Sequence, residues 1–197
     1  MEMIFATGNK DKVREFNEIL GDGVTVKTMK EAGIKVDIVE DGETFEENAL
    51  IKARTVAKAI DYSAAVVSDD SGLEVDYLGG KPGVYSARWL GEDTSYDIKN
   101  AELIKLLADA KDDERGAHYV CAIAVILPDG TEYCVRGTMD GEIAKAPAGD
   151  GGFGYDPVFY VPSLGMTAGE MTAEQKHSIS HRGNACRLMK EKLGDLI

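Results

Sequence analysis

Apolar positions near the start of the chain follow two different spacings. Residues 3–6 form a short apolar run, whereas Val13, Phe16 and Ile19 recur three residues apart. The run predicts a buried strand, and the recurrence predicts an amphipathic helix. Residues 24–28 alternate between apolar and polar side chains, which predicts a second strand. The chain is therefore expected to begin as strand, helix and strand.

A second helix and a third strand are predicted after an acidic connector. Thr44 and Glu47 have the spacing of a capping box, in which two side chains satisfy backbone N–H groups at a helix start. The predicted apolar face of this helix consists of Ala49, Ala53, Val56, Ala57 and Ile60. Residues 64–68 predict a strand, which we expect to end in a solvent-facing turn at Asp69 and Asp70.

The pattern changes after residue 78. Residues 78–89 hold too many glycines and prolines for regular structure and predict a shaped loop. Thr94 could cap a third helix, from about Tyr96 to Ala110. Residues 119–144 then predict two long strands in an antiparallel hairpin, with its turn at residues 128–130.

A last helix is expected to begin near His181. Its predicted apolar face consists of Ala185, Leu188, Met189 and Leu193. Helices alternate with strands at both ends of the chain, and the hairpin lies between them. This order predicts an α/β fold with a mixed sheet flanked by helices, built as two lobes with a cleft between them.

Length and composition narrow the class of protein. The 197 residues suit a single domain, residues 1–197, made of two lobes. A formal net charge of −13 argues against a general nucleic-acid binder, because phosphate backbones would be repelled. The three cysteines form no CxxC pair, which favours reduced thiols in a reducing compartment. With no long apolar span and no signal-peptide pattern, we expect a soluble intracellular protein.

The segment ATGNKDK, residues 6–12, joins the first predicted strand to the first predicted helix. A helix start presents backbone N–H groups and a positive dipole end, where a phosphate can bind. Lys10 and Lys12 add positive charge nearby. The spacing is not that of a P-loop. From these residues alone, the segment is either an ordinary turn or a phosphate-binding loop.

Two groups of carboxylates could hold a divalent cation. Residues 37–47 are acidic and are either a solvated connector or a source of metal ligands, of which Glu40 is the best candidate. Asp69 and Asp70 either shape a turn or ligate a metal and activate water as a general base. Mg²⁺ requires few protein oxygens, because waters and substrate phosphates complete its coordination.

Two later segments offer groups for a nucleotide base. In GGFGYD, residues 151–156, Phe153 is either an anchoring aromatic or a platform on which a flat base stacks. The segment QKHSISHRG, residues 175–183, is either a solvated basic helix start or a set of donors to carbonyl and phosphate oxygens. A metal-dependent nucleotide hydrolase needs a phosphate-binding loop, carboxylates for a metal, an aromatic side chain for the base and hydrogen-bond donors. The sequence offers a candidate for each of these parts.

Five segments in order resemble the motifs of the inosine triphosphate pyrophosphatase family, whose members hydrolyse non-standard purine nucleoside triphosphates. They are TGNKDK, TFEENALIKA, DDSGLEVDYLGGKPGVYSARW, GGFGYDPVF and KHSISHRGNA. The similarity extends from Thr7 to about Ala185. It implies an elongated two-lobed mixed α/β fold of the ITPase type, with the active-site cleft between the lobes. It also implies Mg²⁺ as cofactor and a homodimer, whereas a cytoplasmic location is expected from the cysteines.

The resemblance also implies roles for individual residues. Asp70 would be the catalytic proton acceptor and a metal ligand, with Glu40 as the second metal ligand. The substrate-binding residues implied in the first half are Thr7, Gly8, Asn9, Lys10, Asp11, Lys12, Lys52, Ser71 and Arg88. Those implied in the second half are Phe153, Gly154, Tyr155, Asp156, Lys176, His181 and Arg182.

Purine chemistry suggests how such a site would select its base. Hypoxanthine and xanthine carry a carbonyl at position 6, where adenine carries an amino group, so a donor such as Arg182 would favour the first two. Polar selectivity of this kind can reach about 10⁴-fold. One rival hypothesis is a nucleotide sensor that binds without turnover. The related Maf-like pyrophosphatases are another, although their motif order fits this chain poorly.

Overall fold

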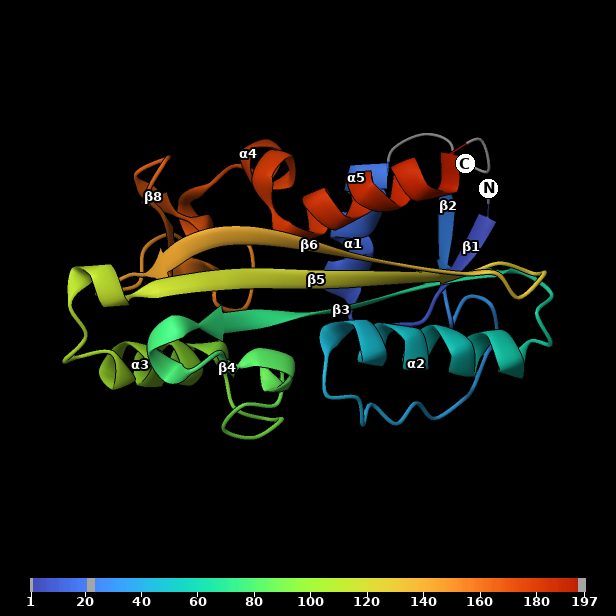
Figure 1. Ribbon diagram of the computed structural model, residues 1–197, viewed down its shortest axis with the longest axis horizontal. Coiled ribbons are helices and arrows are strands. Elements are labelled where there is room, and N and C mark those ends of the chain that lie inside the picture. The colour runs from blue at the N-terminus through green and yellow to red at the C-terminus, as the bar shows by residue number, and fades with distance from the viewer. Residues whose placement is uncertain (1, 21–23, 195–197) are drawn as a thin grey trace. The chain divides into compact units, whose positions relative to one another are not determined.

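The computed structural model describes residues 2–20 and 24–194. Its strands form one mixed sheet in the order β2-β1-β3-β5-β6-β7-β8, and β4 pairs with β3 (Figure 1). The strands are Glu2–Phe5 (β1), Thr25–Thr28 (β2), Ala65–Val75 (β3), Lys81–Pro82 (β4), Gly116–Ile126 (β5), Glu132–Ile143 (β6), Phe159–Val161 (β7) and Met166–Thr167 (β8). The α-helices are Lys10–Leu20 (α1), Phe45–Ala59 (α2), Tyr96–Leu106 (α3), Ala173–Ile179 (α4) and His181–Leu193 (α5). The predicted mixed α/β sheet flanked by helices is confirmed.

The chain divides into two compact units. The first contains Met1–Asp70, Cys121–Gly137 and His181–Ile197, and the second contains Ser71–Val120 and Thr138–Ser180. Strands β3, β5 and β6 each contribute residues to both units.

The first unit packs helices on both faces of its strands. β1 lies between β2 and β3 and is parallel to both. Within this unit, α2 covers one face, and α1 and α5 lie together on the other (Figure 1). The Phe5 and Phe16 rings, whose centroids are 4.7 Å apart, join β1 to α1 in the core. The predicted helical face of α1 therefore packs inward.

The second unit has its own apolar core. Tyr119 of β5 stacks on Phe159 of β7 with ring centroids 4.2 Å apart. β7 is antiparallel to both β6 and β8. Leu103 and Leu107, at the end of α3, are fully buried in this core. Among the described helices of the whole chain, none combines the length and apolar content needed to cross a membrane.

The predicted capping box of α2 is confirmed. Thr44 accepts a hydrogen bond from the Glu47 backbone N–H, and the Glu47 carboxylate accepts from the Thr44 backbone N–H. Glu46 and Glu47 in the first turn also favour the positive end of the helix dipole. Four of the five predicted apolar residues are fully buried; the fifth, Ile60, is half-buried at the C-cap.

The expected turn at Asp69 and Asp70 is wrong. β3 continues through both residues as far as Val75, and both side chains are buried. A turn was expected because adjacent carboxylates usually require water; here cationic side chains supply the compensating charge, as described below.

Other boundaries also differ from the sequence prediction. Thr94 does not cap α3, because its hydroxyl donates to the Leu90 carbonyl. The N-cap is Ser95, whose side chain forms no cap hydrogen bond among the described residues. The helix ends at Leu106 rather than Ala110. On α5, Leu188 is 41% exposed and does not belong to the buried face. The short helix α4 was not predicted.

Candidate active site

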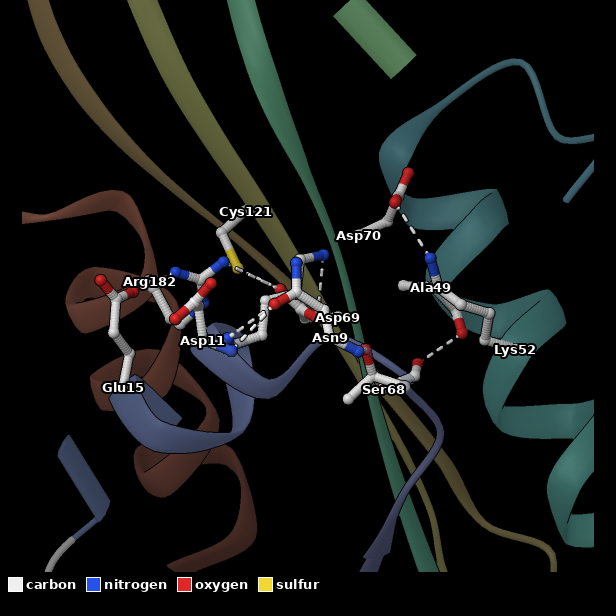
Figure 2. A network of polar contacts seen from close by, with 12 residues as sticks. Asn9, Asp11, Glu15, Ala49, Lys52, Ser68, Asp69, Asp70, Cys121 and Arg182 are labelled. Atoms are coloured by element: carbon white, nitrogen blue, oxygen red, sulfur yellow. Dashed lines mark hydrogen bonds and ion pairs between the residues drawn. The ribbon is translucent and has the colours of Figure 1, made fainter. Parts of the chain in front are cut away.

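Strand geometry separates the two adjacent aspartates. Successive side chains of a strand point to opposite faces. Ser68 and Asp70 accordingly contact α2, whereas Asp69 points toward α1 and α5 (Figure 2). Each carboxylate therefore has its own group of partners.

Asp70 belongs to a cluster of two carboxylates and one lysine. The Lys52 ammonium of α2 donates to Asp70 Oδ1 at 3.0 Å and also forms an ion pair with Glu40. The other carboxylate oxygen, Asp70 Oδ2, is buried, and none of the residues that the structure describes forms a hydrogen bond with it. A buried acceptor left without a partner costs free energy unless a ligand satisfies it.

The charges in this cluster depend on one another. Burial raises the pKa of Asp70 by more than the nearby Lys52 and Lys12 lower it. Burial alone would lower the pKa of Lys52, but Asp70 and Glu40 raise it overall. Lys52 is therefore held in its charged form between the two carboxylates.

The residues of the cluster fit a magnesium ion. Within the described part of the chain, no group of three or more His, Cys, Asp or Glu side chains could hold a metal ion. Mg²⁺ is commonly bound by one or two carboxylates together with waters and substrate phosphates. Glu40 and Asp70, with the unpartnered Oδ2, are suited to this open mode of binding.

On the opposite face of β3, a cationic side chain contacts each carboxylate oxygen of Asp69. The Lys12 ammonium lies 3.2 Å from Asp69 Oδ1, and Arg182 donates to Oδ2 at 3.2 Å. Burial would raise the pKa of Asp69, but Lys12, Arg182 and Lys52 together hold it well below its ordinary value. Asp69 therefore remains ionised and fixes the positions of two basic side chains.

Arg182 is buried in this network and is only 1% exposed. Its second partner is Glu15 of α1, which forms a buried ion pair with Nη1. Sequence analysis did not identify Glu15. Its position beside Phe16 places a carboxylate near the apolar face of α1, but nothing local in the sequence indicates that Arg182 is its partner.

The loop before α1 is organised by its own side chains. Asn9 Oδ1 accepts from the backbone N–H groups of Asp11 and Lys12 at 2.9 and 3.3 Å, and Thr7 Oγ1 accepts from Asn9 N–H at 3.1 Å. The backbone N–H groups of Asn9, Asp11 and Lys12, which lie where a phosphate was predicted to bind, thus already form hydrogen bonds within the loop. Lys10 is exposed, and Asp11 pairs with Arg14.

In the second unit, Asp156 organises the glycine-rich loop. This buried carboxylate accepts from Phe153 N–H at 2.7 Å, from Lys176 Nζ at 2.8 Å and from the Tyr119 hydroxyl at 3.2 Å. The Lys176 ammonium lies 5.0 Å from the centroid of the Phe153 ring. Gly152 adopts φ +71, and a Cβ there would collide with Asp156.

A second loop of this unit is tied to the first. The Tyr155 hydroxyl donates to the Ser86 carbonyl at 2.8 Å, and Asn100 of α3 donates to the Gly154 carbonyl at 3.2 Å. Arg88 lies two residues after Ser86, and its guanidinium is 5.0 Å from the centroid of the Tyr85 ring.

The structure thus gathers the predicted residues into groups. In the first unit, Lys12 and Arg182 converge on Asp69, and Glu40 joins Lys52 and Asp70. In the second unit, Phe153 and Lys176 converge on Asp156. Outside these groups, Ser71 is half-buried on β3, and His181 is buried at the first position of α5.

Comparison with known proteins gives consistent matches over the whole chain. Residues 3–192 match the Ham1 family. The chain is 47% identical to the dITP/XTP pyrophosphatase of Exiguobacterium sibiricum, covering 98% of this chain and 97% of that protein. It is 42% identical to that of Clostridium perfringens, covering 100% and 98%. The solved Ham1 protein of Staphylococcus aureus is 41% identical, with a TM-score of 0.87 and full coverage of both chains.

Proposed function

The chain belongs to the Ham1 family, and from this membership we propose that it hydrolyses non-standard purine nucleoside triphosphates. The substrates would be dITP, XTP and ITP, and the products the nucleoside monophosphate and pyrophosphate. The observation that supports this function best is the cluster of Glu40, Lys52 and Asp70, in which Lys52 and Asp70 are buried and one Asp70 carboxylate oxygen has no partner among the described residues.

Glu40 and Asp70 would hold Mg²⁺ in this proposal. When bound, Mg²⁺ supplies positive charge that stabilises the phosphate oxygens in the transition state. Lys52 fixes the orientation of Asp70 through Oδ1, which leaves Oδ2 for ligand or water. Asp70 would accept the proton of the attacking water. A carboxylate beside a cation is only a modest base, and a bound Mg²⁺ would compensate by lowering the pKa of that water.

The triphosphate would be bound by residues from the first half of the chain. Its ligands in the first half of the chain would be Thr7, Gly8, Asn9, Lys10, Asp11, Lys12 and Lys52, with Ser71 as a further contact. Gly8 supports this role because a Cβ built there meets no atom within 4 Å, so the backbone is open to a close ligand. The Lys12 side chain is 15% exposed, so it is not fully enclosed by the protein.

The base would be recognised by an aromatic platform and fixed donors. Phe153, Gly154, Tyr155 and Asp156 would form the platform together with Lys176, whose ammonium Asp156 holds beside the Phe153 ring. Arg88, His181 and Arg182 would donate to substrate oxygens. Arg182 is held in place by Glu15 and Asp69, and a donor fixed in this way rejects an amino group more strongly than a mobile one.

The remaining expectations concern the whole protein. We propose a homodimer in the cytoplasm, without nucleic-acid or membrane partners. The cysteines are free, which suits a reducing compartment. Light scattering of the full chain in solution tests the homodimer.

A substrate panel tests the proposed reaction. Pyrophosphate release with Mg²⁺ should be fast for ITP, XTP and dITP and slower for ATP by about 10⁴-fold. Equal rates for ATP and ITP would contradict the proposed base selectivity.

The Asp70→Asn variant separates catalysis from binding. Loss of the general base should reduce kcat by at least about 10²-fold, whereas nucleotide binding measured by calorimetry should persist. Turnover close to that of the wild type would contradict the role of Asp70. A wild-type chain that binds ITP without releasing pyrophosphate would instead support the sensor hypothesis.

A further inference from the structure

The segment that carries Glu40 has little structure of its own. Residues 34–42 form neither helix nor strand, and Val39 beside Glu40 is 70% exposed. The Glu40 side chain is attached to the protein through Lys52. An ion pair with a flexible lysine does not fix a backbone, so some other contact must determine where Glu40 is presented.

A buried asparagine of α2 supplies that contact. Asn48 is 1% exposed, and its Oδ1 accepts from the Gly42 backbone N–H at 2.9 Å. Gly42 lies two residues after Glu40, so this bond fixes the backbone close to the carboxylate.

The contact between Gly42 and Asn48 is tight and requires glycine. A Cβ built at Gly42 would lie 2.8 Å from Asn48 Oδ1, 2.8 Å from Glu47 Cβ and 3.0 Å from Asn48 N. Asn48 and Lys52 are four residues apart on α2 and therefore share one face of the helix. One face of α2 thus holds both the backbone at Gly42 and the side chain of Glu40.

We propose that Asn48 is a positioning residue for metal binding, which acts through Gly42 to hold Glu40 at the site it shares with Asp70. This inference rests on the proposed role of Glu40 as a metal ligand. Without the Asn48–Gly42 bond, the loop must be ordered when the metal binds, and the affinity for metal falls by that cost. Once metal is saturating, the loop is ordered, and catalysis by Asp70 proceeds nearly unchanged.

The test uses Asn48→Leu, which keeps the number of side-chain heavy atoms and their branching and removes the acceptor. Mn²⁺ binding to the full chain is measured by electron paramagnetic resonance, with the non-hydrolysable α,β-methylene analogue of ITP present. We expect Mn²⁺ to bind about tenfold more weakly, as is typical when a group that orients a ligand is removed. In turnover assays the half-saturating Mg²⁺ concentration should rise by a similar factor, while kcat at saturating Mg²⁺ stays within about twofold.

Asn48→Asp and Thr55→Val serve as matched variants. Asn48→Asp retains an acceptor for Gly42 and should restore Mn²⁺ affinity. Thr55→Val also removes one side-chain hydrogen bond from α2, to the Ile51 carbonyl, but it does not touch the loop. It should bind Mn²⁺ as the wild type does.

Gly42→Ala should resemble Asn48→Leu, and the double variant should lose less affinity than the sum of the two single losses.

The Glu40→Gln variant distinguishes failure of this inference from failure of the proposed metal site. If Glu40→Gln weakens Mn²⁺ binding but Asn48→Leu and Gly42→Ala do not, Asn48 has no positioning role and the metal site stands. If Glu40→Gln leaves Mn²⁺ binding unchanged, both proposals are overturned. An equal loss of kcat at saturating Mg²⁺ in Asn48→Leu and Asn48→Asp would also overturn the positioning role.

Discussion

At the scale of single residues, two neighbouring carboxylates have different surroundings because strand side chains alternate. Asp69 faces Lys12 and Arg182, and Asp70 faces Lys52. The sequence predicted that both residues were important and that Asp70 was the more direct participant. It could not predict their burial, because the compensating cations Lys12, Lys52 and Arg182 come from distant parts of the chain.

The same limit explains why Glu15 was missed. A carboxylate three or four residues from apolar neighbours usually lies at the border of a buried face. Only the contact with Arg182, at the other end of the sequence, makes Glu15 a buried ion-pair partner. Pairing between distant charges has no local signal, whereas the capping box of α2, formed within four residues, was predicted correctly.

His118 gives a prediction for pH. Its Nδ1 lies 2.8 Å from Asp140 Oδ1, and its Nε2 lies 3.3 Å from Asp76 Oδ1. The hydrogen bond with Asp140 raises the pKa of His118 above 6.5, against the opposing effect of burial and with help from Asp76. Because the folded-state pKa is raised, the charged histidine stabilises the fold below pH 6.5, and this stabilisation is lost as pH rises through the folded-state pKa.

The measurement compares wild type with His118→Gln by urea unfolding on either side of that pKa. The advantage of the wild type should be present in acid and vanish in base, and it should stay below about 1 kcal/mol because the side chain is 38% exposed. Asp140→Asn should lower the His118 pKa measured by NMR. A pH-independent difference between wild type and His118→Gln would contradict this interpretation.

At the scale of elements, the sequence pattern predicted α1, α2, the two long strands β5 and β6, and the start of α5. The helices bury mainly one apolar face each, whereas residues 119–126 of β5 are buried on both faces. It failed where side-chain contacts override the local pattern. The prediction ended β3 before its charged residues, whereas the strand continues to Val75 because those charges are compensated. The N-cap of α3 was assigned to Thr94, whose hydroxyl instead bonds to the Leu90 carbonyl.

The packing of β6 against α5 gives a prediction at this scale. A Cβ built at Gly137 would lie 2.9 Å from Ala185 Cα and closer still to Ala185 N and His181 O. These are backbone atoms of α5 and cannot move as a flexible side chain can. Gly137→Ala should therefore reduce the free energy of unfolding by about 1–3 kcal/mol, as is typical of overpacking.

Urea denaturation measures the Gly137→Ala effect, and Gly130→Ala is a partial control. A Cβ at Gly130 meets no atom within 4 Å, although the residue has φ +84, so its cost is backbone strain of about 1 kcal/mol. Gly137→Ala should also weaken substrate binding if His181 and Arg182 at the start of α5 contact the nucleotide. A variant as stable as the wild type would show that α5 can move away from β6.

At the scale of the whole molecule, net charge and local charge point to different partners. The chain carries 35 acidic and 22 basic residues, so its long-range field repels phosphate. Lys12 and Lys52 are basic groups of the first unit and Lys176 is one of the second, and each is paired with a carboxylate of its own unit. A small triphosphate that brings its own Mg²⁺ can bind to such a site, because the cation offsets the repulsion. For a long nucleic acid, the net charge of −13 predicts repulsion that no bound cation of this kind would offset along its whole length.

We therefore predict that the protein does not bind duplex DNA while it binds nucleoside triphosphates. With a labelled duplex of about 20 base pairs, fluorescence anisotropy should show no binding up to about 100 μM protein at low or physiological salt. The α,β-methylene analogue of ITP with Mg²⁺, titrated into the same protein by calorimetry, is the positive control. Its affinity should decline only modestly with salt, since few charges are exchanged with solvent. DNA binding that weakens steeply as salt rises would reveal a basic surface strong enough to overcome the net charge of −13.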